Sequence, residues 1–176
     1  MVILKCMAAR DIFHNLVKQA LQNEGWNITH DPFKIMLGRR RGYIDLGAEK
    51  EVIAAQKGNE KIAVEIKSFI GHSDLDDFED ALGQFLLYWK ALKNTDSERT
   101  LYLAVPNGFY QRFFDDPFFI DVATTFDVKM LVFDRHGNHI FSSQNKNSFI
   151  WNGMSSANRP IPTDTYWYVL EWIEPD

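Results

Sequence analysis

The sequence predicts an α/β domain built on a mixed sheet that is flanked by helices. Apolar residues recur at helical spacing in two long segments, and short runs rich in β-branched residues lie between and after them. These segments follow in the order helix, three strands, helix, strand, helix, strand. A length of 176 residues with 45% hydrophobic residues suits one such domain with a small appendage.

The first predicted helix covers residues 8–25, where apolar side chains recur every three to four positions and Gly25 provides a stop. Residues 26–37 are predicted to be extended, with Pro32 turning the centre of this run into an edge or a bend. A flexible basic turn is expected at residues 38–42.

The stretch from residue 43 to residue 69 is predicted to hold two extended runs joined by a turn at residues 58–59. The first run carries Asp45, and the second places Glu65 and Lys67 inside an otherwise apolar strand. Side chains two positions apart on a strand point to the same face. Because a buried charge without a partner is costly, the two charges pair or their face opens onto a site. We expect Asp45 to converge with them.

A second long helix is predicted from residue 74 to about residue 94, with Ser73 as its N-cap and acids in its first turn. Gln84 and Tyr88 are four positions apart and are therefore neighbours on one face of this helix.

Three more elements are predicted before the composition of the chain changes. They are a strand at residues 99–105, a short helix at 109–114 that Pro117 interrupts, and a strand at 128–133. The last part of the chain then has turn and strand signals only, and it is too short to bury a core alone. We therefore predict an α/β domain over residues 7–134 and a short β-rich C-terminal appendage over residues 135–176.

The charge of the chain argues against a protein that coats nucleic acid by bulk electrostatics, because the net charge is −5. A local basic face stays open, since residues 5–67 hold eleven Lys/Arg and eight Asp/Glu. The single cysteine excludes an internal disulfide and fits a reducing compartment. No apolar run reaches the length of a membrane span, so we expect a soluble, cytoplasmic protein without a membrane partner.

Asp45, Glu65 and Lys67 match the looser form of the PD-(D/E)xK nuclease pattern. Phosphodiester hydrolysis needs a metal that neutralises developing charge and lowers the pKa of the attacking water. The predicted ligands of Mg²⁺, or of Mn²⁺, are the carboxylates of Asp45 and Glu65 with the backbone carbonyl of Ile66. Lys67 would orient the nucleophile or stabilise the leaving charge. The alternative is a structural ion pair between Glu65 and Lys67 on a partly exposed strand.

Gln84 and Tyr88 extend this predicted catalytic site. In one branch of nucleases with this pattern, a glutamine and a tyrosine on the next helix face the site. Gln84 would hydrogen-bond a carboxylate or a metal-bound water, and Tyr88 would contact a phosphate. The alternative is an ordinary amphipathic helix with two polar residues near its edge.

Two further groups of polar residues have roles that the sequence leaves open. Asp11 or His14, on the first helix, would either reach the metal or belong to a solvated face. Arg39, Arg40 and Arg41 would either follow a phosphate backbone or form a solvated turn.

Several segments resemble the XisH family, the cyanobacterial fdxN element excision controlling factors. They are DIFHNLVKQAL, YIDLGAEKEVIAAQKGNEKIAVEIKSFIG, DFEDALGQFLLYWKAL and LYLAVP, and the likeness covers about residues 8–133. The resemblance implies a restriction-endonuclease-like fold. It also implies a role in excision of a DNA element during heterocyst development, beside a companion factor, XisI, and a separate recombinase. On this resemblance the nuclease-type positions are Asp45, Glu65 and Lys67.

The end of the chain has a different resemblance. VFDRHGNHIFSS, WNG and PIPTDTYWYVLEW look like the last part of the gliding-motility-associated C-terminal domain of secreted Bacteroidetes proteins. About forty residues match, which is half of such a domain.

Three functional hypotheses follow from these observations. The first is a Mg²⁺-dependent endonuclease that acts on DNA. The second is a non-catalytic regulator that uses the nuclease fold as a platform for DNA or for an XisI-like companion. The third is an interaction module in which the C-terminal tail completes a β-surface. All three hypotheses leave open whether the protein forms a homodimer, which DNA target it has and how specific it is for that target.

Overall fold

A computed structural model of the chain describes residues 2–50, 60–71, 73–134 and 136–142, without the side chains of residues 2–12 and 141. The predicted turn at residues 58–59, the side chain of Asp11 and the tail from residue 143 onward lie outside the described residues. Within the described ranges, the helices are too short or too polar to cross a bilayer.

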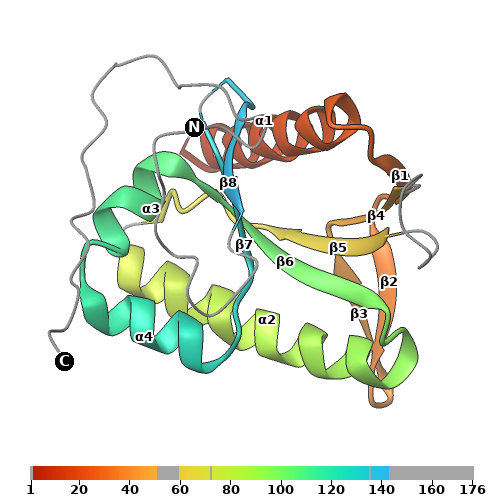
Figure 1. Ribbon diagram of the computed structural model, residues 1–176. Helices are drawn as coiled ribbons and strands as arrows, with labels where there is room; N and C mark the ends of the chain where they lie inside the picture. Colours follow the sequence, from red (N-terminus) through yellow and green to blue (C-terminus); the bar gives the residue numbers. More distant parts are fainter. Residues whose placement is uncertain (1, 51–59, 72, 135, 143–176) are drawn as a thin grey trace, which may run out of the picture.

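A six-stranded mixed sheet forms the middle layer of the molecule (Figure 1). Its strands, in spatial order, are β1 (Asn27–His30), β4 (Leu46–Lys50), β5 (Glu60–Ile66), β6 (Arg99–Pro106), β7 (Met130–Phe133) and β8 (His139–Ser142). Helix α1 (Val2–Asn23) covers one face of the sheet. The other face is covered by α2 (Asp74–Thr95), α3 (Asn107–Phe113) and α4 (Pro117–Thr125). The predicted α/β fold with a mixed sheet flanked by helices is confirmed.

The direction of the strands follows from their connections. Strand β4 is antiparallel to both of its neighbours, β1 and β5. Strands β5, β6 and β7 are parallel, and β8 is antiparallel to β7. Parallel neighbours need a crossover, and α2 supplies it between β5 and β6.

Alternation along β5 divides its side chains between the two faces of the sheet. Ile62 and Val64 belong to the core under α1, and Ala63 belongs to the core under α2. Each large apolar side chain buried in this way contributes about 1.5–3 kcal/mol. Glu65 follows Ala63 on the same face, so the strand directs this acid toward α2.

The ends of the two long helices have the predicted capping residues. Gly25 follows α1 at φ +88°, and the Trp26 N–H donates to the carbonyl oxygen of Leu21 at 3.0 Å, as in a Schellman motif. At the start of α2, the Ser73 hydroxyl accepts a hydrogen bond from the Asp76 N–H at 3.2 Å.

The apolar stripe of α2 differs in part from the predicted one. The helical spacing of the apolar residues in this segment predicts a stripe that includes Leu75 and Trp89, but these residues are 45% and 36% exposed. Tyr88 was expected on a polar face, but it is buried. The small residues of α2 explain the difference, because Ala81 and Ala91 let the helix approach the sheet along a line that includes Tyr88. The buried side chains of α2 are Phe78, Ala81, Phe85, Tyr88, Ala91 and Leu92.

A second, two-stranded sheet lies beside α2 and consists of β2 (Phe33–Leu37) and β3 (Arg40–Ile44). The prediction of a flexible basic turn at residues 38–42 is therefore wrong, because Arg40 and Arg41 belong to β3. Gly38, at φ +64°, and Arg39 alone connect the two strands. Pairing with β2 outweighs the turn signals of this segment, since it buries Gly42 and Ile44 against α2.

Two details of the C-terminal half differ from the prediction. Pro117 begins α4 instead of only ending the preceding helix, and the Asp116 carboxylate accepts a hydrogen bond from the Phe118 N–H at 2.9 Å.

Strand β8 lies beyond the predicted domain boundary at residue 134, yet it pairs with β7. The His139 ring bonds Glu24 at 2.7 Å and ties this strand to the end of α1. The extension over residues 135–176 as a separate unit stays a prediction.

Arg99 anchors β4, β5 and the end of α2 at one edge of the domain. Its guanidinium is buried and donates to the carbonyl oxygens of Ile62, at 2.9 Å, and Ala48, at 3.3 Å. It also pairs with Glu49 at 2.8 Å and with Asp96 at 2.9 Å. A buried cation with this many partners is satisfied, so this end of the sheet is structural.

Candidate active site

A pocket of about 350 Å³ lies where β5 ends and β4 begins. Asp45 directly precedes β4, and the antiparallel register pairs Leu46 with Val64. This register explains why Asp45 and Glu65, twenty positions apart in the sequence, reach the same point. The residues that line the pocket are His14, Tyr43, Asp45, Glu65, Ile66, Lys67, Ser68 and Gln84.

Asp45 is fixed against the end of β5. Its Oδ2 atom accepts a hydrogen bond from the Ile66 backbone N–H at 2.7 Å. Charge-assisted bonds of this kind are short and hold a carboxylate in one orientation. Asp45 is therefore held beside Glu65 before any ligand binds.

Glu65 is the most perturbed carboxylate of the pocket. The side chain is nearly inaccessible, with 3% of the residue exposed. Burial and the negative charge of Asp45 raise its pKa to about 7, although Lys67 acts in the opposite direction. Lys67 Nζ lies 3.4 Å from Glu65 Oε1, whereas Oε2 is buried without a hydrogen-bond partner in the described part of the chain. An unsatisfied buried oxygen of this kind needs an explanation, such as a bound water, a bound ion or a catalytic role.

Lys67 is oriented by a chain of hydrogen bonds that joins three elements. Its Nζ atom donates to Gln84 Oε1 at 2.5 Å, and the Gln84 amide nitrogen donates to the Tyr88 hydroxyl at 2.8 Å. The Tyr88 hydroxyl in turn donates to the carbonyl oxygen of Tyr43 at 2.9 Å. The chain therefore connects the end of β5 through α2 to β3, and it fixes the lysine relative to both.

The structure places Gln84 and Tyr88 differently with respect to the pocket. Gln84 lines the pocket, but its carbonyl oxygen is engaged by Lys67. Tyr88 is 6% exposed and lies behind Gln84, and burial raises the pKa of its hydroxyl. Tyr88 is thus a positioning residue in this arrangement, and its predicted contact with a phosphate stays a prediction.

His14 brings the first helix to the pocket. That it reaches a metal stays a prediction. Its Nε2 atom lies 3.1 Å from Asp31, which Lys18 also contacts at 2.5 Å. Burial raises the pKa of Asp31, but the bonds from Lys18 and the nearby His14 outweigh it, so the pKa lies below its usual value. Among the side chains described, His14 is held at the rim by this acid.

The donor set of the pocket fits a hard divalent cation. Two carboxylates converge on one cavity, and one of their oxygens has no partner in the described residues. Mg²⁺ prefers oxygen ligands and is often bound by one or two carboxylates together with waters and substrate phosphates. The described residues contain no group of three or more His, Cys, Asp or Glu side chains that would hold a metal alone. The ligand role of the Ile66 carbonyl stays a prediction.

Tyr43 is a pocket residue that the sequence pattern did not single out. It precedes Asp45 by two positions, and 48% of the residue is exposed. The signal that could have found it is its place on a strand that leads directly into Asp45.

Comparisons with known proteins agree on one family. The family model described as XisH protein matches residues 7–141. The chain is 40% identical to a crystal structure of an XisH family protein from Nostoc punctiforme, with a TM-score of 0.66, over 74% of this chain and 98% of that one. It is 39% identical to the crystal structure of an fdxN element excision controlling factor protein from Anabaena variabilis, with a TM-score of 0.67, over 76% and 98% of the two chains.

The search of curated proteins found no significant match. The resemblance of the tail to a gliding-motility-associated domain is not confirmed. The family model covers most of the chain, and both solved structures are matched over nearly their whole length. The chain therefore belongs to the XisH family, whose solved members include a protein named as an fdxN element excision controlling factor.

Proposed function

We propose that this protein is a metal-dependent phosphodiesterase that cleaves DNA during excision of a DNA element. The observation that supports the proposal is the buried, unpartnered Oε2 atom of Glu65, which lies in one pocket with Asp45 and Lys67. A fold gains nothing in stability from such an oxygen, so the arrangement favours a site that binds a cation. The family name supports DNA as the substrate.

Asp45 and Glu65 would hold the divalent ion. When bound, Mg²⁺ or Mn²⁺ lowers the pKa of the attacking water and stabilises the charge that develops on the phosphate. Glu65 has a pKa of about 7, so part of the free protein carries a proton on this side chain at neutral pH. Binding of a cation requires Glu65 to release this proton, whereas Asp45 is already oriented by the Ile66 N–H.

Lys67 supplies the positive charge that faces the phosphodiester. Gln84 holds the ammonium group at 2.5 Å, and Glu65 Oε1 lies 3.4 Å away. A cation fixed in this way stabilises developing negative charge without reorganisation. The Gln84 amide is itself fixed by Tyr88, so the distance between the lysine and the carboxylates is set by the fold.

Cleavage of supercoiled plasmid in the presence of Mg²⁺ or Mn²⁺ tests the proposal. Asp45→Asn, Glu65→Gln and Lys67→Met are each expected to lower the rate by about 100-fold or more, the usual effect of removing one electrostatic contact to a transition state. Asp80→Asn on the exposed side of α2 is the matched control for loss of a carboxylate. Unchanged rates in both Asp45→Asn and Lys67→Met would remove the pocket from the reaction.

A second candidate is a non-catalytic regulator that uses the same fold to bind DNA or an XisI-like companion. It is favoured by the acidic net charge of the chain, −5. It requires that the pure protein leaves plasmid intact but co-purifies with the companion. Removal of residues 143–176, which leaves β8 in place, tests whether the tail contributes to that complex. Sedimentation of the purified chain tests whether it forms a homodimer.

A further inference from the structure

The β2–β3 hairpin is seated firmly on α2 by one of its two faces. Ile35, Gly42 and Ile44 are buried on this inner face. A Cβ atom at Gly42 would lie only 3.1 Å from the Tyr88 ring, which shows how closely the strand approaches the helix. The hairpin therefore has a defined position relative to the pocket that Tyr88 supports.

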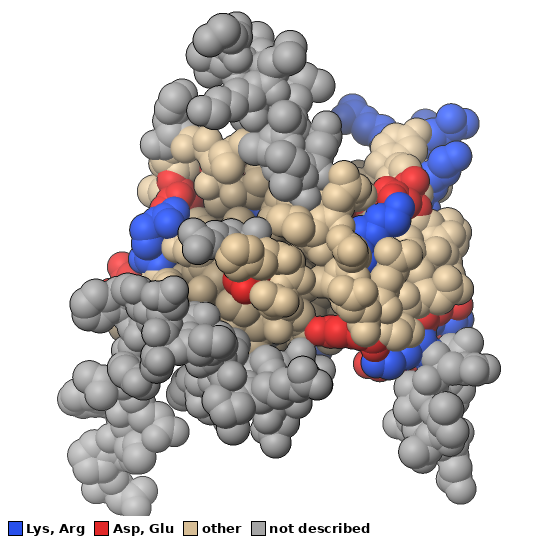
Figure 2. Space-filling view, turned by 90° about the horizontal axis from the view of Figure 1, so that it is seen from above, with Lys and Arg blue, Asp and Glu red and all other residues tan. Residues whose placement is uncertain are grey.

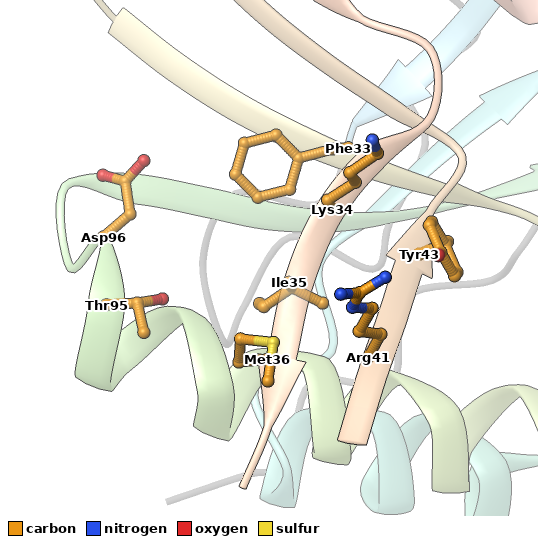
Figure 3. Close-up of a pocket in the computed structure, with 8 residues that line it drawn as sticks. All are labelled: Phe33, Lys34, Ile35, Met36, Arg41, Tyr43, Thr95 and Asp96. Atoms are coloured by element: carbon orange, nitrogen blue, oxygen red, sulfur yellow. The ribbon is translucent and has the colours of Figure 1, made fainter. Parts of the chain in front are cut away.

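The outer face of the hairpin consists of Lys34, Met36, Arg41 and Tyr43. The register pairs Lys34 with Tyr43 and Met36 with Arg41, so these four side chains share the face that points away from α2. All four are exposed, including 49% of Met36 and 48% of Tyr43. Figure 3 shows them along a second pocket of about 640 Å³, which continues to Thr95 and Asp96 at the end of α2.

The hairpin carries a concentration of unpaired positive charge. Lys34, Arg39, Arg40 and Arg41 are exposed, and within the part of the chain that the structure describes none of them forms an ion pair. Figure 2 shows a group of basic side chains at the upper right, on the side where Figure 1 places the hairpin. In a chain of net charge −5, four adjacent cations without acidic partners mark a surface for a polyanion.

Tyr43 connects this surface to the candidate active site. Tyr43 lines both the pocket along the hairpin and the pocket that contains Asp45 and Glu65. A strand of five residues is about 17 Å long. Several monomer units of a polymer that lies along the hairpin therefore contact it before the polymer reaches Asp45. B-DNA carries one charge per about 1.7 Å of its axis and offers a major groove about 12 Å wide that admits a two-stranded ribbon.

We propose that the outer face of the β2–β3 hairpin docks a DNA duplex. Lys34 and Arg41 contact backbone phosphates, and Tyr43 lies against the nucleotide next to the phosphodiester that enters the pocket of Asp45 and Glu65. The identity of the ligand rests on the proposed function, whereas the location rests on the exposed, unpaired cations and on Tyr43.

Fluorescence anisotropy with a labelled duplex in EDTA tests docking without cleavage. The key variant is Lys34→Gln/Arg41→Gln, and the matched control is Lys90→Gln/Lys93→Gln, which removes the same charge from exposed positions of α2. Over about 50 to 200 mM salt, the hairpin variant is expected to lower the slope of log K against log salt by about 2. Its affinity should fall about tenfold or more, while the control stays close to the parent protein. Tyr43→Ala should also weaken binding.

Three outcomes would overturn this inference. They are an equal loss of affinity in both double variants, no loss in either, and a hairpin-dependent preference for a single strand of the same sequence over the duplex. Failure of the proposed hydrolysis gives a different result: plasmid stays intact with Mg²⁺ or Mn²⁺, yet the hairpin variant still loses duplex affinity. Normal cleavage with hairpin-independent binding would instead reject the docking surface and retain the hydrolytic site.

Discussion

Replacing Glu65 by glutamine is expected to stabilise the metal-free protein at alkaline pH. The Glu65 carboxyl is buried beside Asp45, and its pKa is raised to about 7 from an ordinary value of 4.5. A raised pKa means that the folded state favours the protonated acid. The stability linked to this proton is therefore present below pH 4.5 and is lost as the pH rises through 7. Glutamine resembles the protonated acid in size and polarity, and it does not titrate.

The magnitude follows from the difference between the two pKa values. Between about pH 5 and pH 8, ionisation of Glu65 costs the folded state roughly 2 to 3 kcal/mol relative to the unfolded chain, at 1.36 kcal/mol per pKa unit. Glu65→Gln should be close to the parent protein in unfolding free energy near pH 5. By about pH 8 it should be more stable by that same amount.

Urea denaturation of both proteins in EDTA, from about pH 5 to pH 8, measures this difference directly. Glu79→Gln is the control, because it removes one carboxylate from an exposed position of α2. A second series with Mg²⁺ adds the ligand. At a concentration of 100 times its dissociation constant, the ion should stabilise the parent protein by about 2.7 kcal/mol. It should stabilise Glu65→Gln far less.

The reasoning would be refuted by a stability difference between Glu65→Gln and the parent protein that does not grow with pH. That result would mean that the ionised Glu65 is fully satisfied in the metal-free protein. Its Oε2 atom would then give no reason to expect a cation in the pocket.

Three further substitutions test the structure around the site. Ser73→Ala removes the hydroxyl that caps α2 and should lower the free energy of unfolding by about 1 kcal/mol in urea; no change would mean that the cap is replaced. Arg99→Gln leaves Glu49 and two buried carbonyl oxygens without their cation and should cost about 3 kcal/mol in the same assay; a cost under about 1 kcal/mol would contradict its role as an anchor. Tyr88→Phe removes the hydroxyl bonded to Gln84 and should lower plasmid cleavage with a loss of only about 1 kcal/mol in stability; unchanged cleavage would show that the lysine needs no such support.

The sequence was sufficient to predict that Glu65 and Lys67 meet. Their spacing on an extended run places them on one face. Strand β5 ends at Ile66, but the backbone N–H of Lys67 still bonds Ala104, and the charged atoms of Glu65 and Lys67 are 3.4 Å apart. Asp45 comes close to Glu65 because β4 and β5, which are consecutive in the sequence, pair antiparallel. Two extended runs joined by a turn, as the sequence predicts here, indicate such a pairing. The catalytic roles of these residues stay predictions.

Other features depend on tertiary packing that a pattern does not contain. Tyr88 is buried because α2 approaches the sheet through small residues, whereas the sequence pattern placed it with Gln84 outside the apolar stripe. Arg40 and Arg41 have the composition of a loop, but pairing with β2 holds them in a strand. Arg99 begins an apolar strand, and nothing local shows that its partners come from positions about fifty residues earlier.

Arg99 and the carboxylate pocket occupy opposite ends of β5 and its neighbours, and this separation has an evolutionary consequence. The guanidinium secures the strands at one end, so we expect the Glu65 carboxylate at the other end to be dispensable for folding. Substitution at Glu65 would then remove or restore the proposed cation site without loss of a folded chain. We expect members of this family to differ at this position while they keep the same fold.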